Sequence, residues 1–167
     1  MPIIGSFGAG SGKGFGFSGG GSRFICATGG TITESGDYRI HTFTGPGTFS
    51  VEKAPDPTLA VVDYLVVAGG GGAGTSIGGA GGAGGYRESS GTASGCYSAS
   101  PLGAGVSALP VTATTYPITV GAGGAGAPFT GNQGIPSIFS TITSTGGGFG
   151  NGSSGGGGVT GGSGGSG

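Results

Sequence analysis

The stretch SIGGAGGAGGYR, residues 76–87, decides the fold of this chain, because its residues other than glycine recur at every third position. Those positions are Ile77, Ala80, Ala83 and Tyr86. Three residues per turn is the period of the polyproline-II conformation. Ordering glycine costs much conformational entropy, and close packing can offset that cost because bare edges let neighbouring backbones pair their N–H and C=O groups. The stretch therefore predicts a rod in a polyglycine-II bundle, with its Ala, Ser or Thr edge facing outward or toward strands.

The same period returns at two other places in the chain. In VGAGGAGAP the recurring positions are Ala122, Ala125 and Pro128, with Ala127 as an extra. In the tail GGGGVTGGSGGSG they are Thr160, Ser163 and Ser166, with Val159 as the exception. A flexible Gly/Ser linker is the alternative interpretation of 146–167.

The composition leaves little material for a conventional core or for acid–base chemistry. Glycine supplies 49 of 167 residues, charged residues are 7% of the chain and the net charge is −1. Low charge is not typical of disordered chains. From Ser89 onward the only ionisable side chains are those of Cys96, Tyr97 and Tyr116. The second half therefore has almost no general acids, general bases or metal ligands.

Ordinary strands are predicted between the glycine runs. Residues 37–53 alternate as two β-rich runs around Gly45-Pro46-Gly47, which predicts a hairpin. Further strands are expected at 60–69, 114–121 and 137–146. No window shows the spacing and caps of an amphipathic helix, so we expect almost no α-helix. The expected fold is all-β, with a small antiparallel sheet or sandwich joined to packed polyglycine-II helices.

The expected organisation has three parts. Residues 1–27 are expected to form an N-terminal glycine-rich arm or strand, 28–68 a β-hairpin and strand region, and 69–167 a glycine-rich polyglycine-II domain with interspersed strands. In the arm, 7–17 carry glycine at every second position, which puts all side chains on one face. This arm, or an exposed sheet edge, is expected to join subunits by strand addition.

Two segments resemble phosphate-binding motifs but depart from them at required positions. Residues 64–74, YLVVAGGGGAG, resemble a strand feeding a dinucleotide-binding turn, but the glycines that follow are hostile to the helix that such a turn must open. Residues 8–14, GAGSGKG, lack the first glycine and the Ser/Thr of a phosphate loop, since Phe7 and Gly14 stand there. We expect no cofactor.

Catalytic and metal-binding residues are not identified. His41 is the only histidine and is expected at an exposed position of an edge strand, without a nucleophile elbow elsewhere. The carboxylate pairs Glu34/Asp37 and Asp56/Asp63 sit beside turns and are interpreted as solubilising groups. Cys26 and Cys96 match no metal spacing and are either small buried residues or a disulfide. No catalytic, cofactor or metal site is predicted.

Partners are limited by charge and hydropathy. Five basic residues spread over the first 87 positions make no nucleic-acid patch. No run of 18 apolar residues is present, so no membrane partner is expected. The N-terminus lacks the pattern of a secretory signal peptide.

Several segments together resemble the glycine-rich domain of bacteriophage virion proteins, especially tail-fibre and receptor-binding proteins. They are VVDYLVVAGGGGAG at 61–74, GGAGGYRE at 81–88, YPITVGAGGAGA at 116–127 and SIFSTITSTGGGFGNG at 137–152. The segments MPIIGSFGAGSGKGFG at 1–16 and GDYRIHTFTGPGTFSV at 36–51 resemble the N-terminal parts of structural proteins of cyanobacterial phages. The resemblance implies a role on the virion surface. Some phage adhesins with packed polyglycine-II helices share this resemblance. The present sequence lacks the obvious variable loops between glycine runs that such adhesins have.

The expected function is that of a structural virion protein, a tail-fibre or fibre-like surface component. Its expected partners are further copies of itself, as a homo-oligomer or filament, other virion proteins and a host surface receptor. It would be part of the virion and would reach the outside by lysis. The alternatives are a self-assembling extracellular filament subunit, whose contacts repeat without closing, and an ice-binding protein.

Overall fold

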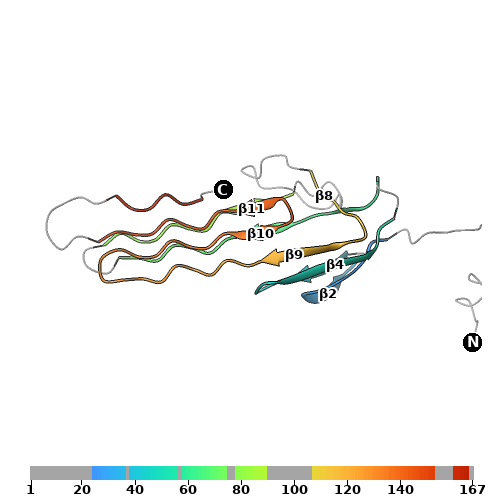
Figure 1. Cartoon of the computed structure of the whole chain (residues 1–167), viewed down its shortest axis with the longest axis horizontal. Coiled ribbons are helices and arrows are strands. Elements are labelled where there is room, and N and C mark those ends of the chain that lie inside the picture. Colours follow the sequence, from blue (N-terminus) through green and yellow to red (C-terminus); the bar gives the residue numbers. More distant parts are fainter. Residues whose placement is uncertain are drawn as a thin grey trace, which may run out of the picture.

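The computed structural model describes residues 24–36, 38–55, 58–74, 78–89, 107–152 and 160–165. All regular elements in this part of the chain are strands and none is a helix, which confirms the all-β prediction. The strands gather at one end of an elongated molecule, and wavy glycine-rich segments run away from them as a bundle (Figure 1). The predicted arm 7–17 lies outside the described residues.

The largest sheet is antiparallel and has the order β1-β4-β9-β10-β11. Its strands are β1 (Cys26–Thr28), β4 (Gly47–Lys53), β9 (Thr115–Thr119), β10 (Ser137–Phe139) and β11 (Ile142–Ser144). Three two-stranded antiparallel sheets accompany it. They pair β2 (Thr31–Ser35) with β3 (Tyr38–Thr42), β5 (Val61–Val62) with β8 (Leu109–Pro110), and β6 (Leu65–Val67) with β7 (Tyr86–Glu88).

A conventional hydrophobic core lies at this end of the molecule. Ala27, Phe49, Val51 and Val111 are buried together. The ring of Phe49 packs edge-on against Phe139, with 5.9 Å between ring centroids. Alternation along β4 explains this burial, since Phe49 and Val51 lie on the same face of the strand. The sheet end therefore has the side-chain packing that the glycine segments lack.

The predicted hairpin within 37–53 is wrong in its pairing. The strand β3 pairs with β2, through a turn in which Gly36 has a φ of +58°. The following strand, β4, pairs instead with β1 and β9. Periodicity identified both runs as strands, but the long-range pairing that buries Phe49 wins over the short Gly-Pro-Gly connection.

Two predicted single strands are each divided. Residues 60–69 contain β5 and β6, which belong to different sheets. Residues 137–146 form a hairpin of β10 and β11. Its turn passes through Ser140, which has a φ of +55°, a conformation that few residues other than glycine adopt. The strand predicted at 114–121 is confirmed as β9.

The predicted division into 1–27, 28–68 and 69–167 stays a prediction. The strand β1 crosses the first of these boundaries, and β4 and β9 pair in one sheet although they fall on either side of the second.

Candidate functional site: the glycine-rich bundle

Six described glycine-rich segments continue the strands, and we call them rods. They are rod A (68–74), rod B (78–85), rod C (121–127), rod D (131–136), rod E (145–152) and rod F (160–165). Rod A follows β6, rod B precedes β7, rod C follows β9, rod D precedes β10, and rod E follows β11. The bundle thus grows out of the sheets (Figure 1).

The register of the strands passes into the rods without a shift. Val67 pairs with Tyr86 in the β6–β7 sheet, and the next bond runs from Ala68 N–H to Gly85 O. Beyond the β9–β10 pair, Ile135 N–H bonds to Ala122 O. The sheets therefore set which rods are neighbours and how they align.

Rod A bonds to four other rods, as rod E also does. The N–H groups of Ala68, Gly71 and Gly74 donate to carbonyls of rod B, and those of Gly69 and Gly72 donate to rod D. Rods C and E donate their own N–H groups to carbonyls of rod A. The backbone bonds are Ala68 N–H to Gly85 O at 3.0 Å, Gly71 N–H to Gly82 O at 2.8 Å, Gly74 N–H to Gly79 O at 3.3 Å, Gly69 N–H to Ile135 O at 3.1 Å, Gly72 N–H to Asn132 O at 2.8 Å, Gly124 N–H to Gly70 O at 2.8 Å, Ala127 N–H to Ala73 O at 3.1 Å, Gly147 N–H to Gly69 O at 2.8 Å and Gly150 N–H to Gly72 O at 2.8 Å.

The other rods are joined by the same three-residue spacing. Rod B donates to rod E, rod D donates to rods C and E, and rod F donates to rod E. Examples are Gly82 N–H to Gly148 O at 2.8 Å, Asn132 N–H to Ala125 O at 2.9 Å, Gly134 N–H to Gly147 O at 2.9 Å and Gly162 N–H to Phe149 O at 2.9 Å. A strand offers its bonds in two directions, whereas these segments offer them in three. The polyglycine-II conformation of the rods stays a prediction.

Glycine is required inside the bundle because neighbouring backbones occupy the space of a side chain. A Cβ on Gly71 would overlap the carbonyl of Gly148, and one on Gly124 would overlap the carbonyl of Asn132. The hydrogen that stands in place of Cβ points at that oxygen, in the manner of a Cα–H···O contact. The strand β6 lies beside β10 and β11, and β7 lies beside β11, while the rods that extend these strands bond to one another directly.

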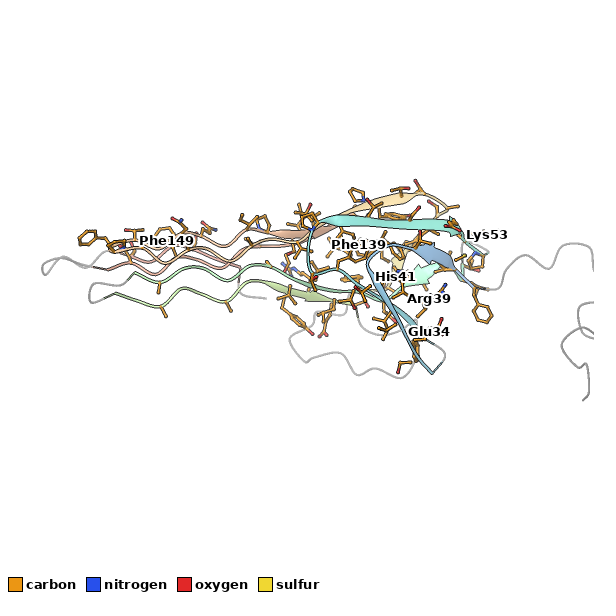
Figure 2. The ribbon with its side chains drawn as sticks, turned by 90° about the horizontal axis from the view of Figure 1, so that it is seen from below. Glu34, Arg39, His41, Lys53, Phe139 and Phe149 are labelled. Atoms are coloured by element: carbon orange, nitrogen blue, oxygen red, sulfur yellow. The ribbon has the colours of Figure 1, made fainter. Side chains whose placement is uncertain are left out.

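Most side chains that the rods carry are exposed, although Ala68 at the start of rod A is buried. Exposed residues at the predicted third positions are Ala80, Ala83, Ala122, Ala125, Thr160 and Ser163. Side chains are dense around the sheets and sparse along the rods, where Phe149 is an exception (Figure 2). Its half-buried ring lies against Gly162 of rod F. No rod contains a charged residue. The bundle therefore offers neutral backbone and small side chains as its surface.

Three of the rods were not found from the sequence. The strand predicted at 60–69 and the turn-like motif at 64–74 both overlap rod A (68–74), but neither predicts a rod there. Rods D and E escaped because their residues other than glycine follow no simple repeat. The signal that could have found them is the spacing of glycine itself, at Gly131 and Gly134 and at Gly147 and Gly150.

The candidate catalytic residues do not form a site. His41 is half-buried rather than exposed, and its ring packs edge-on against Phe49 at 5.1 Å. Its Nδ1 lies 2.8 Å from Gly29 O and donates to it, because a carbonyl only accepts. This bond holds the imidazole at the edge of the core.

The acidic residues have structural partners. The carboxylate of Glu34 lies 3.6 Å from the Arg39 guanidinium on the β2–β3 hairpin (Figure 2). The Oδ1 of Asp63 accepts a 2.7 Å bond from Ser89. Asp37 and Asp56 lie outside the described residues.

The described ranges contain neither a candidate metal site nor a membrane-spanning helix. No group of His, Cys, Asp and Glu there could hold a metal ion. No helix in that part of the chain is long and apolar enough to cross a membrane. Cys26 has a free, half-buried thiol, and Cys96 lies outside these ranges.

The match to a known family spans the bundle and most of the sheets. The family model described as glycine-rich domain matches residues 44–167. The chain belongs to the glycine-rich domain family. In this member of the glycine-rich domain family the matched region begins shortly before β4 and includes all six rods. A comparison with curated proteins and with solved structures finds no match.

Proposed function

We propose that this glycine-rich domain protein is a structural component of a bacteriophage virion, a tail fibre or fibre-like surface component that acts by self-assembly and by contact with a host surface. The observation that carries the proposal is the bundle in which rod A is bonded to four neighbours. Its role is mechanical and includes no catalysis.

A bundle of this kind is suited to a fibre exposed to the surroundings. Its bonds link backbone to backbone, so they depend little on ionic strength or pH, and the rods carry no charged groups. A protease needs an extended segment released from its neighbours, and the rods are held at every third residue. The bundle should therefore stay rigid where host proteases and varying salt act on it.

The resemblance of 61–74, 81–88, 116–127 and 137–152 to virion glycine-rich domains supports the same proposal. Most of these segments lie in the rods or in the strands that lead into them. The proposed partners are further copies of the chain, other virion proteins and a host surface receptor.

Immunogold electron microscopy tests this proposal. Phage particles purified from a lysate of the host would be incubated with antibody against the full chain, with antibody against an unrelated glycine-rich protein as the control. We expect gold on fibres or on the particle surface. Unlabelled particles would contradict the proposal, and gold on free filaments in the lysate would instead support the filament subunit.

A further inference from the structure

Rod A has one row of backbone donors that bonds to none of the described residues. Its N–H groups fall into three rows because the hydrogen bonds repeat every three residues. The first row bonds to rod B and the second to rod D. The third consists of Gly70 and Ala73, whose N–H groups have no acceptor among the described residues. Gly70 is half-buried and Ala73 is exposed.

This row lies beside rod C. The carbonyls of Gly70 and Ala73 accept bonds from rod C, and the adjacent edge of rod C is formed by Gly123 and Gly126, which are both exposed. A Cβ on Gly123 would lie 3.6 Å from Gly70 O, which is an ordinary contact. We call these four residues, Gly70, Ala73, Gly123 and Gly126, the open edge.

The open edge carries acceptors as well as donors. Rod C supplies them, because the carbonyls of Gly123, Gly124 and Gly126 receive no N–H from any described residue, whereas those of Ala122 and Ala125 are bonded to rod D. Unpaired backbone groups at an exposed edge are a template for pairing with another chain. Here the spacing of the groups limits which chain can pair.

We propose that the open edge binds the open edge of a second copy of this chain, so that two bundles join side by side. Donors three residues apart along a polyproline-II segment repeat about every 9 Å, while equivalent groups along a β-strand repeat about every 7 Å. A rod matches this spacing and a strand does not. This inference rests on the self-assembly in the proposed function and assigns a surface to it.

A second copy fits the chemistry of the edge better than a charged or bulky partner. Neither rod A nor rod C contains a charged residue, and three of the four residues of the open edge are glycine. In a symmetric contact between two copies, the N–H groups of rod A in each copy face the carbonyls of rod C in the other copy. The pairing repeats between chains the bonds that already join rods within one chain.

Sedimentation velocity of the full chain tests the inference with two variants on adjacent residues. Gly123→Leu adds a side chain on the open edge, whereas Ala122→Leu enlarges an exposed side chain on another row of the same rod. We expect a native dimer, a similar dimer for Ala122→Leu, and at least tenfold weaker association for Gly123→Leu. A native chain that is monomeric at every concentration, or Gly123→Leu that dimerises like Ala122→Leu, would overturn the inference.

Amide exchange on the native chain gives a second readout that needs no variant. We expect the Gly70 and Ala73 amides to become more protected as protein concentration rises. Protection independent of concentration would mean that a segment of the same chain covers the edge, and would overturn the proposed partner. Virion labelling is a separate measurement, so the edge assignment can fail while the proposed virion role stands.

Discussion

The sheet end and the glycine bundle use the same strand pairings but different means of cohesion. At the sheet end, buried side chains such as Phe49 and Val51 hold the layers together. Beyond Ala68 and Gly85 the layers contain almost no side chains, and backbone groups of different layers bond directly. The chain therefore stays ordered where side chains are absent. In the sheets each strand forms backbone hydrogen bonds in two directions, whereas in the bundle each rod offers them in three. The two regions should respond oppositely to a change in side-chain size.

The largest effect is expected from removing the central ring of the sheet end. Phe49 is 7% exposed and packs against His41, Tyr116 and Phe139. Phe49→Ala should lower the free energy of unfolding by about 3–5 kcal/mol, through lost burial and the cavity left behind. Urea denaturation followed by tyrosine fluorescence measures this change.

The matched control is Phe129→Ala, because Phe129 is 53% exposed and lies between rods C and D. Its substitution should change stability by less than about 0.5 kcal/mol. Equal losses for the two variants would mean that the sheet end is not held by its aromatic core.

A single added methyl group should break the bundle at one glycine and not at its neighbour. A Cβ on Gly71 would meet the carbonyl of Gly148, while one on Gly70 would lie 3.5 Å from Gly82 O. Gly71→Ala should cost about 1–3 kcal/mol through overpacking. Gly70→Ala should be neutral or stabilising by up to about 1 kcal/mol, because alanine restricts the unfolded chain.

Thermal unfolding of the two glycine variants and the native chain, run in parallel at low protein concentration, measures this difference. The bundle account would be contradicted if Gly71→Ala were as stable as Gly70→Ala.

A smaller effect is expected from two buried serines of the sheet end. Ser89 is 2% exposed, and its Oγ donates to Asp63 Oδ1 at 2.7 Å and accepts from Tyr64 N–H at 3.1 Å. Ser144 is 0% exposed, and its Oγ has no partner among the described residues. Ser89→Ala should cost about 1–2 kcal/mol, whereas Ser144→Ala should be neutral or slightly stabilising.

Denaturant titration of both serine variants checks the sign as well as the size of the change. A loss for Ser144→Ala equal to that for Ser89→Ala would show that the Ser144 hydroxyl is paired in solution.

The fold could be predicted from the sequence where a short period carries the information. The three-residue spacing at 77–86 marked rod B, and the same spacing marked rods C and F. Rod D could not be identified in this way, because Asn132, Gln133 and Ile135 hide a spacing carried by only two glycines. Its place in the bundle is set by its neighbours.

The pairing of strands was harder to predict from the sequence than their location. Alternation in 38–43 and 48–51 identified strands, but the partner of β4 is chosen by burial of Phe49 against residues more than 60 positions away, such as Tyr116. The open edge could not be predicted either, since it depends on which sides of rod A are occupied by other rods. A repeat in the sequence predicts that a segment forms a rod, but it does not predict which other rods lie beside it.

Residue-resolved hydrogen exchange along rod B tests the central claim most directly. The amides of Gly79, Gly82 and Gly85 donate to rod E, while those of Ala80 and Ala83 have no acceptor among the described residues. We predict slow exchange at the three glycines and fast exchange at the two alanines, a protection pattern with a period of three. Fast and uniform exchange over 78–85 would contradict the account and would make this segment a linker.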